Sequence, residues 1–309
     1  MQEKQVTLCK SWSTFCASNR REEVHHTCHS IKMQSVIAIV GTVFLALYFT
    51  NVLASDRNVE NKTIEGNGKL LLSSSQLEAH SGRIINGKNG NIATFPYIVR
   101  MRVNNVGICG ASIITYTHVF TAAHCLYDNQ DPASITLYGG SASQTSGGIV
   151  FFACKVIIHP QYDPETQDYD AGIVQIKKSF HGYKNIAPIA LQNAEVPSNT
   201  SCYVIGWGLT NYDVKITPDI MQYAILKVIS PLQCSVAWSS YATPQFICAK
   251  HTVNEDVCNG DSGGPFVCNG KLTGATSYSG QGCRSKMPSA FVKVTAPAIR
   301  EFIRTNVGI

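Results

Sequence analysis

The sequence predicts an all-β fold, a barrel or a sandwich, from residue 84 to the C-terminus. Short β-branched and aromatic segments alternate there with Gly, Pro, Asn and Ser turns, as in FPYIVRMRV, GIVFFACKVII and AGIVQIKK. No helical period separates these segments, which is typical of many short strands joined by turns. Only the end, APAIREFIRTNV, has helical spacing, with Ile299, Phe302 and Ile303 on one face. We therefore expect strands followed by one C-terminal helix.

Composition and charge exclude several classes of function. The 309 residues are 44% apolar and 15% charged, as in globular proteins. The formal net charge is +5 and the basic residues are scattered along the chain, so we expect no nucleic-acid partner. Nothing in the sequence requires an oligomer, and we expect a monomer.

The spacing of the cysteines favours disulfides over metal ligands. The chain has twelve cysteines but no CxxC pair and no histidine cluster at zinc spacing. Most lie in the strand-rich region, which indicates cross-links made in an oxidising compartment. The segment 139–153 also lacks Asp and Glu, the ligands that a calcium loop would need. We expect neither a metal nor a cofactor.

The N-terminal third contains an apolar segment that predicts secretion. Residues 35–54 are free of charge and end in Val-Leu-Ala, as a signal peptide does. Residues 1–34 form an N-terminal extension before this segment, and translation from Met33 would give an ordinary signal peptide with residues 1–32 upstream of it. The alternative is a type II membrane anchor, which length permits. Residues 55–83 are polar and aperiodic, which suits a propeptide.

Three motifs supply the parts of a nucleophilic serine site. A serine hydroxyl needs a base, an orienting carboxylate and donors for the oxyanion. TAAHC contains His124, DYDAGI contains Asp170 and GDSGGP contains Ser262. Asp168 competes with Asp170, but the apolar run after Asp170 favours the latter. We interpret His159, in HPQY, as a surface or core residue.

These motifs, in the order His, Asp, Ser, resemble those of the chymotrypsin/trypsin family, including secreted trypsin-like enzymes of insects. The resemblance covers residues 84–309. It implies two six-stranded antiparallel Greek-key barrels with a C-terminal helix. It also implies that Ser262 attacks the substrate carbonyl, that His124 moves the proton and that Asp170 fixes the imidazole tautomer. Backbone N–H groups of Gly260 and Ser262 would form the oxyanion hole.

The sequence RIING resembles the activation site of the same family. Cleavage after Arg83 would free an ammonium group on Ile84, and this group would turn inward to pair with Asp261. The chain is then a zymogen whose partner is an activating protease or a second molecule of the enzyme itself.

The family pattern also implies the cross-links. The expected pairs are Cys109–Cys125, Cys202–Cys268, Cys234–Cys248 and Cys258–Cys283. Cys154 is left over in an apolar strand, and we expect a buried free thiol.

Asp256 lies six residues before Ser262, at the family's position for the base of the primary pocket. A carboxylate there selects Lys or Arg, and the alternative is an exposed acid. Ser277 matches the serine that supports the triad carboxylate beside the substrate site, and the alternative is an ordinary strand serine.

The walls of the expected pocket depart from the trypsin-like pattern. Ser279 and Ser289 stand where glycines are usual, and Tyr278 stands where Trp is usual. Side chains at both wall positions would narrow the entrance, although Gly280 provides one wall if the register shifts by one. We expect cleavage after Arg or Lys with reduced efficiency, with an elastase-like or very narrow specificity as the alternative.

Together these features predict a secreted, extracellular serine endopeptidase. Its partners are protein and peptide substrates and protein protease inhibitors. The alternative function is a catalytically silent homologue that binds or regulates a partner. Sequons at Asn61 and Asn199 predict N-glycosylation of a secreted chain.

Overall fold

The computed structural model describes residues 84, 87–105, 107–251, 256–280, 283 and 287–309. The expected N-terminal extension, signal peptide, propeptide, Arg83 and the sequon at Asn61 lie outside the described residues. Within the described part, no helix is long and apolar enough to cross a membrane.

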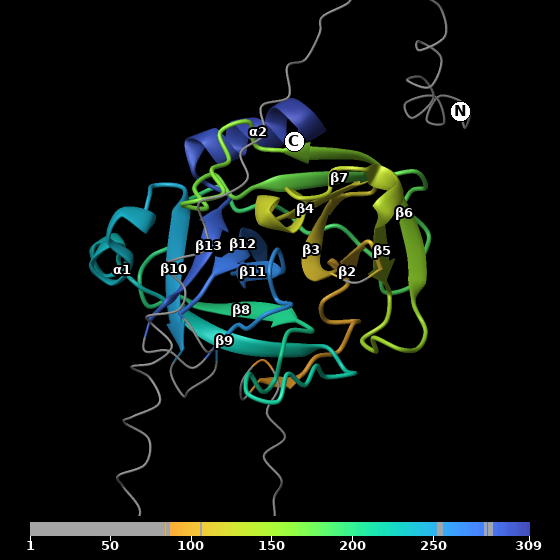
Figure 1. Cartoon of the computed structure of the whole chain (residues 1–309), viewed down its shortest axis with the longest axis horizontal. Coiled ribbons are helices and arrows are strands. Elements are labelled where there is room, and N and C mark those ends of the chain that lie inside the picture. The colour runs from red at the N-terminus through yellow and green to blue at the C-terminus, as the bar shows by residue number, and fades with distance from the viewer. Residues whose placement is uncertain (1–83, 85–86, 106, 252–255, 281–282, 284–286) are drawn as a thin grey trace, which may run out of the picture. The chain divides into compact units, whose positions relative to one another are not determined.

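The first half of the described chain forms a closed antiparallel barrel (Figure 1). Its strands are β2 (Ile98–Val103), β3 (Gly107–Thr115), β4 (His118–Thr121), β5 (Ile135–Gly139), β6 (Ile149–Ile158) and β7 (Gly172–Ile176). They pair in the order β2-β3-β4-β7-β6-β5. Side chains of β5 alternate between buried and half-buried, because successive strand residues point to opposite faces.

The second half repeats this arrangement. Its strands are β8 (Ser201–Gly206), β9 (Gln222–Val228), β10 (Phe246–His251), β11 (Pro265–Cys268), β12 (Lys271–Tyr278) and β13 (Ser289–Lys293). Their order is β8-β9-β10-β13-β12-β11, and β11 pairs with β8 to close the ring. The short β1 (Lys88–Asn89) adds to the edge of β9. The expected pair of six-stranded antiparallel barrels is thus confirmed.

In the part of the chain that the structure describes, two α-helices accompany the barrels. The C-terminal helix α2 (Pro297–Val307) was expected, and it buries Ile299, Phe302 and Ile303. The helix α1 (Pro231–Trp238) was not expected, since only Cys234 of it is buried and it has no apolar face. Its sequence signal is a capping box, in which Ser230 and Gln233 satisfy each other's backbone N–H. Three single-turn 3₁₀ helices complete the list: η1 (Ala123–Cys125), η2 (Pro132–Ser134) and η3 (Ser239–Tyr241).

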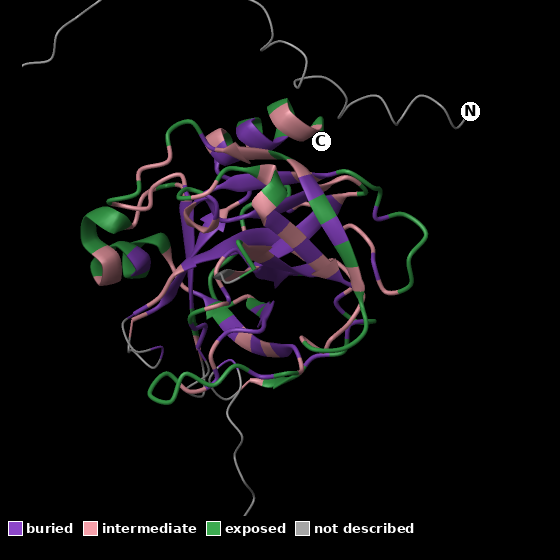
Figure 2. Cartoon of the chain, turned by 45° about the vertical axis from the view of Figure 1, so that its right-hand side comes forward, coloured by how far each residue is buried: buried purple, intermediate pink, exposed green. Residues whose placement is uncertain are grey.

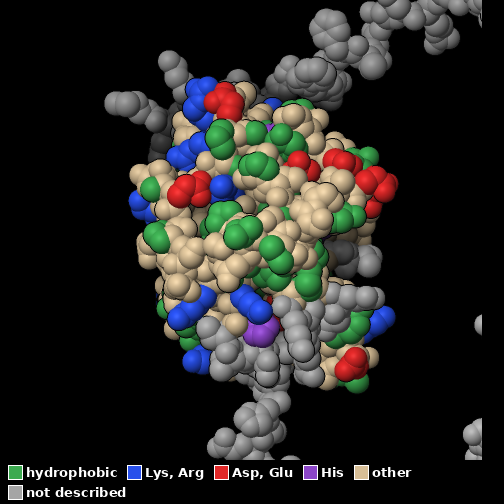
Figure 3. Space-filling view, turned by 90° about the vertical axis from the view of Figure 1, so that its left-hand side faces the viewer, with side chains coloured by type: hydrophobic (Ala, Val, Ile, Leu, Met, Phe, Trp, Pro, Cys, Tyr) green, Lys and Arg blue, Asp and Glu red, His purple; other side chains and the backbone are tan. Residues whose placement is uncertain are grey.

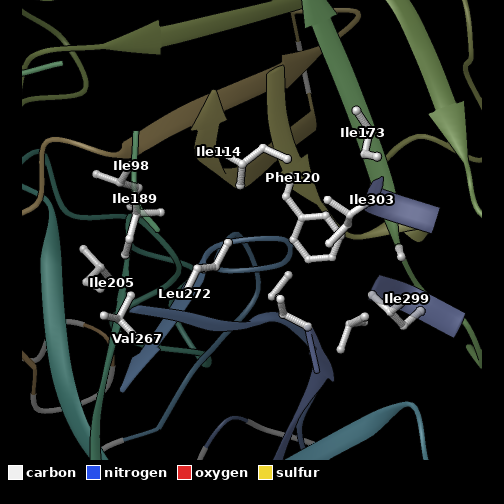
Figure 4. Close-up of a cluster of buried hydrophobic side chains, with 14 of the residues drawn as sticks. Ile98, Ile114, Phe120, Ile173, Ile189, Ile205, Val267, Leu272, Ile299 and Ile303 are labelled. Carbon is white, nitrogen blue, oxygen red and sulfur yellow. The ribbon is translucent and has the colours of Figure 1, made fainter. Parts of the chain in front are cut away.

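One hydrophobic cluster joins both barrels and α2. Burial is concentrated in the strands, and the loops between them are mostly exposed or half-buried (Figure 2). In the close-up of Figure 4, Phe120 of the first barrel and Leu272 of the second point toward a shared centre, with Ile303 of α2 beside them. The barrels are therefore held together by apolar packing along their interface.

Charged side chains of both signs lie on the face that carries α1, separated by apolar and neutral ones (Figure 3). Two ion pairs of the described part are the partly exposed Lys293–Glu195, at 3.2 Å, and the exposed Arg304–Glu301, at 2.7 Å. Exposed pairs of this kind contribute little to stability. The fold therefore depends on the core.

The four expected disulfides are present: Cys109–Cys125, Cys202–Cys268, Cys234–Cys248 and Cys258–Cys283. The prediction for Cys154 was wrong, because this residue of β6 is disulfide-bonded and half-buried. Sequence order cannot reveal the partner of a cysteine that the family pattern leaves unassigned.

We predict that Phe120→Ala lowers the free energy of unfolding by about 3–5 kcal/mol, since it opens a cavity in the core that both barrels share. Phe120 is 0% exposed, whereas Phe152 of β6 is 56% exposed, so Phe152→Ala is the matched control and should have a much smaller effect. Urea unfolding of both variants measures the difference, and equal losses would contradict the shared core.

Candidate active site

Strand pairing brings His124 and Asp170 together. His124 lies in η1, directly after β4, and Asp170 lies two residues before β7. Because Thr121 of β4 pairs with Gly172 of β7, the loop after one strand faces the loop before the other. The Nδ1 atom of His124 lies 2.7 Å from Oδ2 of Asp170.

The carboxylate of Asp170 is fully buried and accepts hydrogen bonds from three donors. The backbone N–H of His124 donates to Oδ1 at 2.8 Å. Ser277 Oγ, from β12 of the second barrel, donates to Oδ2 at 2.6 Å. Since a carboxylate can only accept, Nδ1 of His124 carries the ring proton, and Nε2 of the neutral ring is left as a base.

The competing acid and the second histidine have other partners. Asp168 Oδ1 accepts from Thr243 Oγ1 at 2.6 Å and from the backbone N–H of Tyr169 at 2.9 Å. His159 is 5% exposed and stacks on the ring of Tyr169. Burial lowers the pKa of His159, although Asp168 and a backbone hydrogen bond oppose this shift. His159 is therefore a core residue, as expected.

Ser262 lies in the loop before β11, which is docked against the first barrel. Its carbonyl accepts from the N–H of Gly110, in β3, at 2.7 Å. Gly263 has a φ of +72°, and a Cβ there would collide with Thr121 Oγ1 and the carbonyl of Gly110, so only glycine fits. Ser262 and His124 line the same cavity of about 320 Å³. Within the described part, no hydrogen bond joins Ser262 Oγ to His124.

The backbone N–H groups expected to bind the oxyanion make no hydrogen bond to the described residues. Among the described residues, the backbone N–H groups of Gly260 and Ser262 have no hydrogen-bond acceptor, whereas the N–H groups of Gly263 and Gly264 donate to Thr276 and Asp261. Gly260 has a φ of +98°, a conformation that favours glycine. Two backbone donors near Ser262 are thus available to a ligand.

Asp261 is buried beside the loop. Its Oδ1 accepts from the N–H of Gly208 at 2.8 Å, and its Oδ2 accepts from the N–H of Cys258 at 3.0 Å. Burial raises the pKa of Asp261 to about 7, although the two backbone hydrogen bonds oppose this. No cation pairs with it in the described part of the uncut chain. Ile84 is itself buried, in a hydrophobic cluster that also contains Val257.

Three of the expected wall residues border the cavity: Tyr278, Ser279 and Gly280. Tyr278 packs edge-on against Trp238 and Phe246, and its hydroxyl donates to the carbonyl of Tyr241 at 2.8 Å. Ser277 also lines the cavity. Three lining residues that sequence reasoning missed are Gln167, Tyr212 and Asn259, which belong to none of the motifs.

Ser289 differs from its expected place. It does not line the cavity, and it is 2% exposed with its Oγ donating to Oδ1 of Asp256 at 2.7 Å. Asp256 is 1% exposed and does not line the cavity either. In the uncut chain its small side chain turns inward because a buried carboxylate offers it an acceptor, and the narrowing of the entrance by Ser289 stays a prediction. Of the two serines expected at the walls, Ser279 lines the cavity in the uncut chain.

Comparison with known proteins assigns this arrangement to a family. The sequence profile described as Trypsin matches residues 84–303. The chain belongs to the trypsin family of serine proteases. Trypsin alpha-4 of Lucilia cuprina is 32% identical over 219 residues, which cover 70% of this chain and 84% of that protein. Trypsin delta of Drosophila melanogaster is 30% identical, over 73% of this chain and 88% of its own length.

A third relative differs in its overall length. Transmembrane protease serine 9 of Rattus norvegicus is 30% identical over 70% of this chain, but the match covers only 21% of that protein. The similarity is thus confined to one part of the longer protein. As a member of the trypsin family, this chain is expected to act on protein substrates.

The sulfur atoms of Cys109 and Cys125 lie near the ring of His124 in this trypsin-family site. Cys109, His124 and Cys125 come within 4.8 Å of one another. Because the two cysteines form a disulfide with each other, neither offers the thiolate that a metal site would need. The bridge instead ties η1 to β3.

The pKa of His124 reflects two opposing effects. Burial of the ring favours the neutral form, but the charge of Asp170 and its hydrogen bond outweigh burial and raise the pKa above its usual value. A protonated His124 is therefore stabilised by the carboxylate behind it.

We predict that Asp170→Asn lowers the pKa of His124, because burial then acts without the opposing charge. An NMR titration of the imidazole nitrogens in the uncut protein measures the shift. Asp168→Asn is the matched control, since Asp168 hydrogen-bonds to Thr243 and not to His124. An unchanged pKa in Asp170→Asn would contradict this account.

Proposed function

We propose that this chain is a secreted serine endopeptidase, made as a zymogen and activated by cleavage after Arg83. The observation that carries the proposal is the hydrogen-bonded pair of His124 and Asp170, with Ser262 lining the same cavity. This is the arrangement that activates a serine hydroxyl for acyl transfer.

The proposed reaction has two halves. In the first, Ser262 Oγ bonds to the substrate carbonyl carbon while its proton passes to Nε2 of His124. The peptide C–N bond then breaks, the leaving amine takes that proton, and an acyl-enzyme remains. In the second half, water bonds to the acyl carbon while one of its protons passes to Nε2 of His124. The ester bond to Ser262 Oγ then breaks, Oγ takes that proton from His124, and the carboxylic acid product leaves. Asp170 stabilises the imidazolium that forms in each half.

The backbone N–H groups of Gly260 and Ser262 are proposed to bind the oxyanion. Both lack an acceptor among the described residues, so neither has to give up a protein partner for the developing charge. Loss of one such donor typically costs about 3–4 kcal/mol in the transition state. The geometry of the glycine-flanked loop therefore matters as much as the triad.

Activation is proposed to work through Asp261. A buried carboxylate without a cation partner is unfavourable, and the raised pKa of Asp261, about 7, expresses this. Cleavage after Arg83 would create an ammonium group on Ile84, whose side chain is already buried. Pairing of this group with Asp261 would fix the loop that carries Gly260 and Ser262.

The proposed specificity is for Lys or Arg at P1, the residue before the cleaved bond. Asp256 supports this assignment, because it is the acid six residues before Ser262 and one of its oxygens has no hydrogen-bond partner among the residues that the structure describes. It is covered in the uncut chain, so we propose that activation also opens the way to it.

Secretion is supported by the four disulfides of the described part, which are stable in an oxidising compartment. Asn199 of the second sequon is exposed just before β8, so its side chain is accessible for glycosylation. We propose that residues 35–54 are removed as a signal peptide and that the enzyme acts outside the cell.

We predict that the full chain, cut after Arg83, is labelled by a fluorophosphonate probe at Ser262. Ser262→Ala should abolish labelling, and His124→Ala should nearly abolish it because the hydroxyl loses its base. His181→Ala is the control, since His181 is exposed and remote from the cavity. A cut and folded protein that is not labelled would favour the silent homologue.

We also predict that Arg83→Gln gives a secreted protein without activity after treatment with a trypsin-like activating protease. The physical reason is that no ammonium group forms to pair with Asp261. Peptide turnover before and after treatment measures this, with the wild-type chain as the positive control. Full activity in the uncut variant would refute the proposed switch.

A further inference from the structure

The two oxygens of the buried Asp256 carboxylate have different surroundings. Oδ1 accepts from Ser289 Oγ at 2.7 Å and from the backbone N–H of Val257 at 2.9 Å. Oδ2 is buried and has no hydrogen-bond partner among the described residues. A carboxylate oxygen offers about two lone-pair sites, so Oδ1 is saturated, whereas no described residue occupies a site on Oδ2.

This asymmetry bears on which cation the carboxylate can bind. A guanidinium binds a carboxylate best as a fork, with two parallel N–H donors that need one free site on each oxygen. An ammonium group is a compact charge with three rotatable donors, and it needs only one carboxylate oxygen. Only the second mode fits the free Oδ2.

Ser289 offers the ammonium group a second partner. After donating its proton to Asp256, its Oγ still has lone pairs that can accept. Oδ2 and Ser289 Oγ together therefore supply two acceptors for one ammonium group. With glycine at position 289, the hydroxyl would be missing. Oδ1 of Asp256 would then keep a free site for one of the two guanidinium N–H donors.

We infer that Ser289 is a specificity residue that makes this enzyme prefer lysine over arginine at P1. The inference rests on the proposed function, since it assigns the kind of base that Asp256 selects. It concerns the base of the pocket and not its wall, where Ser279 lies.

The protonation of Asp256 is consistent with this role. Burial raises the pKa of Asp256, while the hydrogen bond from Ser289, a more distant effect of His251 and the N–H of Val257 oppose the rise. The serine hydroxyl thus also favours the ionised carboxylate that a cation requires.

The test compares peptides that differ only at P1, with Lys, Arg or the uncharged norleucine, using the full chain cut after Arg83. We expect kcat/KM for Lys to exceed that for Arg by about tenfold, the value of one charge-assisted hydrogen bond. Ser289→Gly and Ser289→Ala should each shift the Lys/Arg ratio toward Arg by a similar factor. Ser179→Ala is the control, since Ser179 is exposed and does not line the cavity, and it should leave the ratio unchanged.

Each outcome decides between the two proposals. A wild-type enzyme that prefers Arg, or Ser289 variants with an unchanged ratio, would overturn the role of Ser289 and leave the preference for basic residues intact. Turnover of norleucine but of neither basic peptide would overturn both proposals.

A second measurement uses only the wild-type enzyme, so it does not depend on whether a Ser289 variant folds. The inhibition constants of n-pentylamine and n-butylguanidine, measured with the wild-type enzyme, compare an ammonium group with a guanidinium group at the end of an alkyl chain of similar length. Tighter inhibition by the amine is expected, and tighter inhibition by the guanidine would overturn the inference.

Discussion

Removing a carboxylate from water is costly unless donors replace its hydration, and at Asp170 those donors come from both barrels. His124 supplies its backbone and ring N–H from the first barrel, and Ser277 supplies a hydroxyl from the second. The ring of His124 is orientated only while this set is complete. The site therefore depends on how the barrels meet, and the shared cluster around Phe120 and Leu272 fixes that meeting.

A second carboxylate, Asp261, shapes the loop of the nucleophile. Its oxygens lie so close to Gly206 and Gly208 that a Cβ at either position would collide with them. The loop is thus tied to the end of β8 by close packing as well as by the N–H of Gly208. The two buried acids have different tasks: Asp170 orders the base, and Asp261 positions the residues around Ser262.

The sequence predicted much of this because its strong signals are local. Alternating strands, the apolar face of α2 and the three motifs can be read without knowing which strands pair. The helix α1 was missed because capping, and not an apolar face, defines it. Asp170 was separated from Asp168 only by the apolar run that follows, whereas the strand register Thr121–Gly172 decides it in the structure.

The local sequence does not show the direction of side chains or the pairing of residues that are far apart in the chain. Ser289 was expected at the pocket wall, but its direction depends on Asp256, which lies 33 residues earlier and is brought close by folding. The disulfide of Cys154 leaves no mark in the local sequence. The pairings that the family pattern did assign were all correct.

The two barrels share one strand order but divide the chemistry between them. The first contributes His124 and Asp170, and the second contributes Ser262 together with Asp256, Tyr278, Ser279 and Ser289. In the proposed function, substrate choice therefore belongs to the second barrel. A chimaera that kept the first barrel and took the second from another family member would then show that member's preference at P1. The main constraint on such an exchange would be the packing of the hydrophobic cluster that the two barrels share.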